Sequence, residues 1–306
     1  MRYPFGQGWQ RWTPYILLLP GMFFYVLVAL GPSLATSIYS FTDARGITGA
    51  PVHWIGLDNY HEFLFVGQAA RDNLDALKRT LYFCVTVSVI QFALGLLVAV
   101  LLTQGLWGTR FFRTIFFMPV ILGVVIQGLI WKLFLYPLGG PASQVLDKFN
   151  MYSEFLGGQD AFWWVIVVQI WANMGITMVI FIAGLQAIPA ELGEAAQIDG
   201  ASRWQNFAYV TWPMLTPSVN TNLILNVIGS LQAWQLFLVL IGYRQGTQVL
   251  GYVIYAQGFG QTSGSVTTVF RQGYAAAASM VLFALVLVIG LTTQYVLRRR
   301  EEQLLG

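Results

Sequence analysis

Charged residues are scarce in this chain. Only 9% of its 306 residues are Asp, Glu, Lys or Arg, whereas roughly 25% is usual in soluble domains. Hydrophobic residues make up 57%, and they gather in runs near the roughly 20 residues that an α-helix needs to cross about 30 Å of hydrocarbon. The shortage of charge therefore excludes an ordinary soluble enzyme and indicates a chain that resides in lipid.

Several kinds of site lack the residues they would need. Cys84 is the only cysteine and lies in an apolar run, which excludes a disulfide framework and a multi-cysteine metal site. We interpret it as a small buried hydrophobe. No Gly-Lys dipeptide occurs, so the glycine-rich loop that cradles nucleotide phosphates is missing. The net charge of +3 comes without a basic stripe interleaved with aromatics, which excludes nucleic acid as a partner.

The hydrophobic runs predict an all-α polytopic membrane protein forming one domain over residues 1–306. We expect six transmembrane helices, which puts both termini on one side. The first run follows Arg2 and Arg11 as in a secretory signal, but it is longer than the roughly 7–15 residues of a signal's apolar region and lacks an Ala-x-Ala site, so we expect it to be retained. The six predicted spans are 15–38, 80–102, 115–134, 162–185, 217–240 and 274–296.

Basic residues at the span ends orient the predicted helices. The N-terminal arginines, the loop with Arg110 and Arg113 and the tail Arg298–Arg300 share one face, which the positive-inside rule makes cytoplasmic. Arg71, Lys78 and Arg79 favour the reverse orientation. The expected outer face carries most of the acids, namely Asp43, Asp58, Glu62, Asp72, Asp75, Asp147, Glu154 and Asp160.

Acidic and histidine side chains are missing from the predicted spans, and Lys132, the one charged residue within them, lies at the end of the third span. All thirteen acidic residues lie outside them, and both histidines, His53 and His61, lie in the first outer loop. Ion-coupled carriers commonly place such a group at mid-membrane, where it binds and releases the coupling ion. An intramembrane enzyme would need a metal cluster, or a nucleophile with its base. The predicted spans lack the residues that either an ion-coupled carrier or an intramembrane enzyme would need.

Neutral polar residues do occur inside the spans, in two stripes. Gln169, Asn173 and Thr177 recur every four residues, as do Asn222, Asn226 and Ser230, so each set shares one helix face. Such stripes either bond to another helix or line a water-filled path. Nearby aromatic and amide side chains favour a path for a neutral, hydroxyl-rich solute such as a sugar. The predicted pathway residues are Gln169, Trp171, Asn173, Thr177, Asn226, Ser230, Gln232 and Trp234; we predict no catalytic residue, metal ligand or cofactor.

The loop over residues 186–213 predicts a helix-turn-helix outside the bilayer. Pro189 suits the first turn of a helix, Gly200 can end it, and Ser202 can cap a second helix. Glu191 and Glu194 lie near the first helix's start, where the helix dipole favours carboxylates. The residues alone leave two readings open: a surface that docks another protein, or a solvated helix.

The sequence of this loop carries a family resemblance. Glu194-Ala195-Ala196, followed by Asp199-Gly200-Ala201 and later Pro213, resembles the "EAA" loop of bacterial ABC importer permeases. The stretches 54–60, 111–119, 130–132 and 184–186 are similar to carbohydrate permeases of the maltose and glycerol-3-phosphate type. A Gly-Gly-Gly-Pro turn common after the fifth span is replaced by Ile-Gly-Tyr-Arg-Gln-Gly over 241–246.

The resemblance implies a type I permease fold in which the loop fits a cleft of a separate ATPase. Glu194 would pair with a basic group there, and ATP-driven closure would move the loop and switch the spans between inward- and outward-facing states. Trp171 resembles a sugar-stacking tryptophan and Ser230 a polar pocket residue of that family. The implied coupling residues are Glu191, Glu194, Ala195, Ala196, Asp199, Gly200, Ala201 and Arg203.

The resemblance also implies the partners and location. They are a second, related permease subunit, an ATPase dimer that binds ATP and Mg²⁺, and a solute-binding protein outside a bacterial or archaeal cytoplasmic membrane. This chain is then a transporter subunit rather than an enzyme. The alternatives are an ion-coupled secondary transporter, an importer of a phosphorylated, glycerol-3-phosphate-like cargo, an intramembrane enzyme, or a structural membrane scaffold.

Overall fold

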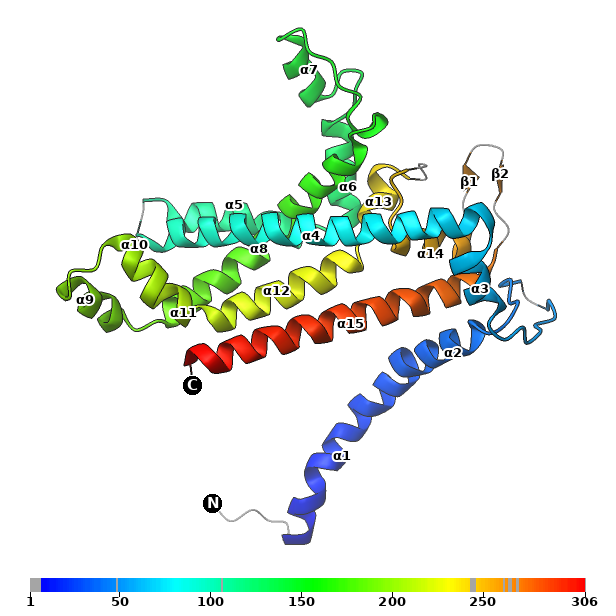
Figure 1. Ribbon diagram of the computed structural model, residues 1–306, viewed down its shortest axis with the longest axis horizontal. Helices are drawn as coiled ribbons and strands as arrows, with labels where there is room; N and C mark the ends of the chain where they lie inside the picture. Colours follow the sequence, from blue (N-terminus) through cyan, green and yellow to red (C-terminus); the bar gives the residue numbers. More distant parts are fainter. Residues whose placement is uncertain are drawn as a thin grey trace. The chain divides into compact units, whose positions relative to one another are not determined.

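The computed structural model describes residues 7–47, 49–105, 107–242, 246–260, 262–263, 266–267 and 270–305 (Figure 1). The described chain is nearly all helical, apart from an antiparallel pair of two-residue strands, β1 (Thr262–Ser263) and β2 (Val266–Thr267). Its contacts divide it into two compact units. Unit 1 comprises Met1–Ala70 with Ile254–Met280, and unit 2 comprises Arg71–Val253 with Val281–Gly306.

Unit 1 begins with a long apolar helix that changes its winding once. Helix α1 (Gln7–Tyr25) runs through a π-helical turn η1 (Val26–Leu30) into α2 (Gly31–Tyr39). Gly31 N–H bonds to the oxygen of Val26, five residues back, and the next residue, Pro32, has no N–H to continue the α-helical pattern. After an irregular loop, α3 (Asp58–Phe65) completes the N-terminal part of this unit.

Unit 2 holds most of the remaining helices, and α4, α14 and α15 each begin in one unit and end in the other. Two apolar clusters form its core: one around Phe83, Val165 and Phe237, the other around Met178 and Phe181. In chain order the helices are α4 (Gly67–Thr103), α5 (Thr109–Ile121), α6 (Val124–Phe134), α7 (Pro141–Asp147), the 3₁₀ turn η2 (Phe155–Gly157), α8 (Ala161–Ala187), α9 (Ala190–Ile198), α10 (Arg203–Asn206), the π-helical turn η3 (Phe207–Thr211), α11 (Trp212–Met214), α12 (Thr216–Leu231), α13 (Gln235–Leu240), α14 (Leu250–Phe259) and α15 (Gln272–Leu305).

Helices α5 and α8 pack with their backbones in contact. A Cβ atom at Gly175 of α8 would lie 2.5 Å from the backbone oxygen of Phe116 and 2.9 Å from the Cα of Phe117, both in α5. Small residues allow this close approach between membrane helices, where van der Waals packing drives association. Gly175 therefore sets the spacing of the pair.

The predicted span 115–134 is a broken helix. Helices α5 and α6 meet at 105°, because Leu122 and Gly123 adopt extended backbone conformations. A break leaves backbone carbonyls without helical partners, which is costly away from water. The buried side chain of Gln127 satisfies two of them: its Nε2 donates to the oxygens of Pro119, at 2.8 Å, and Leu122, at 2.9 Å.

The prediction of one continuous helix over 217–240 is wrong. Helix α12 ends at Leu231, and α13 starts at Gln235 after Trp234 leaves the helical region, with φ −140° and ψ −30°. Close packing accounts for the break. A Cβ atom at Gly128 of α6 would lie 2.4 Å from Val239 Cγ1 of α13. A Cβ atom at Gly251 would lie 3.1 Å from Trp234 Cβ.

Among the described residues, four helices are long and apolar enough to cross a membrane. They are Trp12–Tyr39, Gly67–Thr103, Ala161–Ala187 and Gln272–Arg299, and the bent pair α5–α6 adds a fifth if it counts as one span. Four of the six predicted spans thus correspond to these long helices and a fifth to the bent pair. The described helices are thus long and apolar enough for several membrane crossings.

Candidate functional site

A pocket in unit 2 is lined by eight residues, five of which have neutral polar side chains. Its volume is about 230 Å³, and helices α4, α8 and α12 supply its walls. Among its lining residues none carries a charge. They are Gln91, Gln169, Asn173, Ile176, Leu225, Asn226, Gly229 and Ser230. Four of the predicted pathway residues therefore meet in one pocket: Gln169, Asn173, Asn226 and Ser230.

A hydrogen-bonded network joins the three helices beside this pocket. Gln91 Nε2 of α4 donates to Thr177 Oγ1 of α8, at 2.9 Å, and to Asn226 Oδ1 of α12, at 2.7 Å. Thr177 Oγ1 also donates to Asn226 Oδ1, at 3.3 Å. Asn222 Nδ2 contacts the Thr177 backbone oxygen at 3.4 Å. Thr177 and Asn226 of the predicted stripes thus bond between helices, and Asn226 also lines the pocket.

Gln91 is the polar pocket residue that sequence reasoning missed. It is only 4% exposed and lies in the middle of the predicted span 80–102. Its one signal in the sequence is an amide within an apolar run, which needs a polar partner in hydrocarbon. Gln91 is not part of a series of polar residues that recurs every four positions, so the search for such series did not find it.

The other predicted pathway residues lie elsewhere in unit 2. The ring of Trp171 packs edge-on against Trp131, with centroids 5.6 Å apart. Gln232 is exposed at the end of α12, and Trp234 packs beside Gly251. None of these three lines the pocket, so their place in a transport path stays a prediction.

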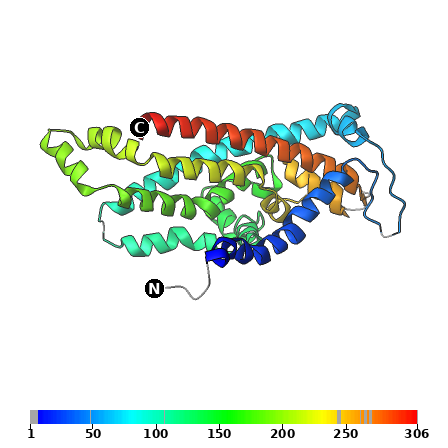
Figure 2. The ribbon, with the colours of Figure 1, turned by 90° about the horizontal axis from the view of Figure 1, so that it is seen from below.

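The segment between α8 and α12 forms a short helix, a tight turn and a second helix. Ala201 N–H bonds to the oxygen of Ala196 at 2.9 Å, and Gly200 N–H to that of Gln197 at 3.1 Å. This pair of hydrogen bonds is typical of a helix that ends at a residue in the left-handed region. Gly200 is that residue, with φ 83°. Pro189 stands at the N-cap, one position before α9. Figures 1 and 2 place α9 and α10 at one end of α8 and α12.

Ser202 caps the second helix through a reciprocal pair of hydrogen bonds. Its Oγ accepts from Gln205 N–H, at 3.3 Å, while Gln205 Oε1 accepts from Ser202 N–H, at 2.8 Å. Such a capping box satisfies two backbone donors at a helix start. Asn206 Nδ2 then donates to the oxygen of Gly193 at 3.3 Å, which ties the second helix back onto α9.

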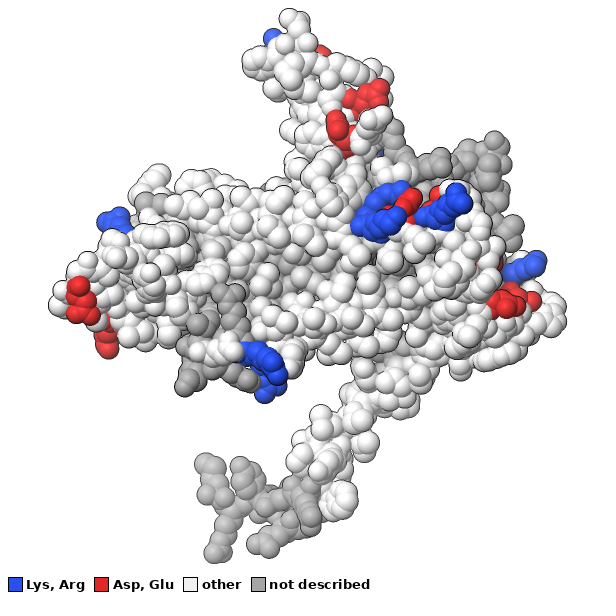
Figure 3. Space-filling model, viewed as in Figure 1, with Lys and Arg blue, Asp and Glu red and all other residues white. Residues whose placement is uncertain are grey.

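The turn presents its charged side chains outward. Acidic side chains gather over α9 in the space-filling view (Figure 3). Six of the predicted coupling residues are exposed: Glu191, Glu194, Ala195, Asp199, Gly200 and Arg203. The other two, Ala196 and Ala201, are half-buried. All eight predicted coupling residues thus share one small protruding segment, which we call the α9 turn (residues 189–206).

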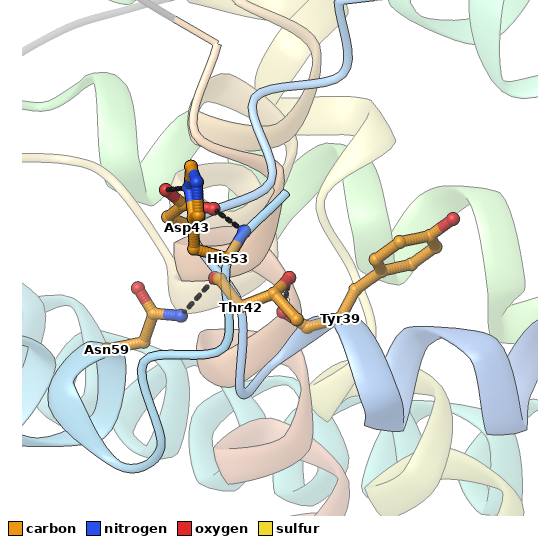
Figure 4. Close-up of polar contacts among 5 residues, drawn as sticks. All are labelled: Tyr39, Thr42, Asp43, His53 and Asn59. Atoms are coloured by element: carbon orange, nitrogen blue, oxygen red, sulfur yellow. Dashed lines mark hydrogen bonds and ion pairs between the residues drawn. The ribbon is translucent and has the colours of Figure 1, made fainter. Parts of the chain in front are cut away.

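In unit 1, the loop after α2 is held by backbone and side-chain hydrogen bonds (Figure 4). Asn59 Nδ2, from α3, donates to the Thr42 oxygen at 2.9 Å, and Thr42 Oγ1 donates to the Tyr39 oxygen at 2.9 Å. Asp43 Oδ1 accepts from the backbone N–H of His53 at 2.6 Å, and Oδ2 lies 3.1 Å from His53 Nδ1. The backbone hydrogen bond from His53, followed by the one from its ring, holds the pKa of the Asp43 carboxyl below its usual value.

An ion pair joins two further segments of unit 1. Arg271 donates to both carboxylate oxygens of Glu62, at 2.9 and 2.5 Å, and its guanidinium carbon lies 4.3 Å from the Tyr274 ring centroid. Arg271 N–H also bonds to the Gln257 oxygen at 2.9 Å. This bidentate pairing joins α3 to the start of α15. Residues 243–245, the centre of the unusual turn noted in the sequence, lie outside the described residues.

The known proteins to which this chain is similar are permeases of transport systems. A probable starch degradation products transport system permease from Thermoanaerobacterium thermosulfurigenes is 29% identical, over 98% of both chains. An sn-glycerol-3-phosphate transport system permease from Agrobacterium fabrum is 28% identical, over 91% of this chain and 92% of that protein. The fold is similar to a bacterial alginate ABC transporter chain, solved in complex with an alginate pentasaccharide-bound periplasmic protein. The TM-score is 0.78, with 23% identity over 96% of this chain and 97% of that one.

Family membership follows from a family match that covers more than half of the chain. Residues 91–302, which include the α9 turn and every residue lining the pocket, match the family described as binding-protein-dependent transport system inner membrane component. The chain therefore belongs to that family and is a membrane permease subunit of an ATP-binding-cassette importer.

Proposed function

We propose that this permease forms half of a translocation pathway for a sugar or related polyol. One observation carries the proposal: the pocket between α4, α8 and α12 is lined by five neutral amide or hydroxyl side chains and by no charged residue. Neutral donors and acceptors match hydroxyl groups, whereas a phosphate monoester would call for Arg or Lys. The carbohydrate named for the Thermoanaerobacterium relative is in line with this choice.

The proposed motor lies in another chain. The α9 turn would seat in a cleft of an ATPase dimer that binds ATP and Mg²⁺, and Glu194 would face a basic group there. Closure of the dimer would carry the turn with it and switch the pocket between the two sides of the membrane. In this arrangement the chain crosses the membrane six times, with the broken segments α5–α6 and α12–α13 each serving as one span, as a single domain with both termini cytoplasmic.

Two further partners complete the proposed importer. A second, related permease subunit would supply the other half of the pathway, and a solute-binding protein would deliver cargo on the outer face. The periplasmic protein bound to the alginate transporter supports the latter. Purification of the chain from native membranes, followed by identification of the accompanying chains, tests this assembly. Recovery of the permease without an ATPase would contradict it.

The cargo class is tested by uptake into vesicles that hold the purified complex. We expect ATP-dependent uptake of at least one of maltose, maltotriose and raffinose, with no dependence on a proton or sodium gradient. Glycerol 3-phosphate belongs in the same panel because one relative is named for it. Uptake of glycerol 3-phosphate alone would shift the cargo to a phosphorylated solute. Uptake by this chain without an ATPase, driven by an ion gradient, would overturn the proposed mechanism.

A further inference from the structure

The amide of Gln91 bonds to side chains of α8 and α12. Its nitrogen donates to two different acceptors, Thr177 Oγ1 at 2.9 Å and Asn226 Oδ1 at 2.7 Å. An amide nitrogen has two hydrogens and its oxygen has none, so both donors of Gln91 are engaged. The side chain is 4% exposed and Thr177 is 1% exposed, so water cannot easily replace these partners.

The same network fixes Asn226. Its Oδ1 accepts from both Gln91 and Thr177, which turns its Nδ2 away from them. Nδ2 is buried and has no hydrogen-bond partner among the described residues, and the residue as a whole is 8% exposed. A buried donor without a partner is unfavourable, so a native protein that retains one usually has a reason.

Two complementary groups are therefore left over beside the pocket. Gln91 and Asn226 both line it. With both its hydrogens engaged, Gln91 has its Oε1 acceptor left, and Asn226 has its Nδ2 donor left. A hydroxyl group is both a donor and an acceptor, so one hydroxyl, or two adjacent hydroxyls, can satisfy both once the cargo displaces the atoms that cover Nδ2. A phosphate group offers chiefly acceptors and negative charge, and Gln91 Oε1 would repel it.

We propose that Gln91 is a specificity-determining residue, which selects cargo hydroxyl groups by presenting its Oε1 as an acceptor while it holds Asn226 Nδ2 ready as a donor. This inference rests on the proposed function, since it assigns a recognition element to the same pocket. The volume of about 230 Å³ is below the roughly 300–1,000 Å³ of pockets that enclose drug-sized ligands. The site therefore suits a single sugar ring or part of a longer chain.

The first test needs no cargo. The purified complex is prepared with asparagine carrying ¹³C in its side-chain carbonyl, and the band of Asn226 is assigned by its loss in Asn226→Ala. In Gln91→Met the Asn226 carbonyl loses a hydrogen bond, so its infrared stretch should move to higher frequency. Ser88→Ala, at a buried position one turn away on α4 and outside the pocket lining, should leave the band in place. An unmoved band in Gln91→Met would overturn the inference.

The second test measures selection of the cargo. Uptake kinetics are compared for the best-transported sugar of the panel and its monodeoxy and monofluoro analogues. Fluorine cannot donate a hydrogen bond, so at the recognised position both analogues should show a KM about three- to tenfold higher in the wild type. In Gln91→Met the KM of the parent sugar should rise by that factor, the analogues should lose their disadvantage, and kcat should stay within about twofold. An analogue penalty that persists in Gln91→Met would overturn the inference.

The two tests separate this inference from the proposed function. A shifted carbonyl band without uptake of any neutral sugar would mean that the amide network is as described and that the cargo class is wrong. Sugar uptake with an unmoved band would retain the proposed function and remove Gln91 from it.

Discussion

The α9 turn and the pocket network are built in opposite ways. In the α9 turn every hydrogen bond given above joins residues at most 13 positions apart. In the network, Gln91 bonds to residues 86 and 135 positions away. The hydrogen bonds of the turn need only residues that are close in the sequence. Those of the network form only when three helices pack together. A substitution in the turn should therefore destabilise only nearby residues, whereas a substitution in the network should destabilise several helices.

The largest effect is expected from charge reversal on the α9 turn. Glu194→Lys would place a cation opposite the proposed basic group of the ATPase, and like charges brought together cost several kcal/mol. Uptake should fall roughly tenfold or more, while the complex retains its ATP hydrolysis. The assay is the ratio of sugar taken up to phosphate released. Gln197→Lys, an exposed position on the same helix, is the control, and an equal loss in both variants would contradict a specific role for Glu194.

A hydroxyl deletion tests whether damage to the network spreads. Thr177→Val removes the group that both accepts from Gln91 and donates to Asn226, and the loss of a buried partner costs about 1–3 kcal/mol. The melting temperature of the complex should fall. Thr221→Val is the matched control, because that hydroxyl is exposed and bonds within its own helix, to the Pro217 oxygen at 2.9 Å. Similar melting temperatures for the two variants would contradict a stabilising role for the network.

Removing the cap tests whether damage to the turn stays local. Ser202→Ala loses the side-chain half of the capping box, at a cost of about 1 kcal/mol. Hydrogen exchange should quicken in residues 203–206 and remain unchanged in α4 and α12. Ser202→Asp keeps an acceptor at this position and should preserve the slow exchange. Faster exchange in the distant helices would show that the turn is not self-contained.

The smallest effect concerns the loop after α2 in unit 1. Because the pKa of Asp43 is lowered in the folded chain, the contribution of its carboxylate is present above the usual value of 3.8 and is lost as the pH falls through the lowered pKa. Asp43→Asn should therefore quicken hydrogen exchange in residues 42–55 at pH 6 relative to the wild type. The difference should shrink toward zero as the pH falls from 3.8 through the lowered pKa. A difference that is constant with pH would rule out the carboxylate as its source.

The same division between local and distant contacts decides what the sequence could predict. Gly200 and Ser202 were predicted as a helix stop and a cap because their roles depend on adjacent residues, and the structure places them so. The break at 232–234 was missed, because it depends on the packing of α13 against Gly128 and of Trp234 beside Gly251. Four-residue spacing found Asn226 and Ser230, but it could not find Gln91, whose partners lie on other helices.

The close contact at Gly175 has a mechanical consequence. With the Phe116 carbonyl where a side chain would begin, α5 and α8 have no clearance along which one could slide past the other. We therefore expect α5 and α8 to shift together during transport, with rearrangement at the break between α5 and α6.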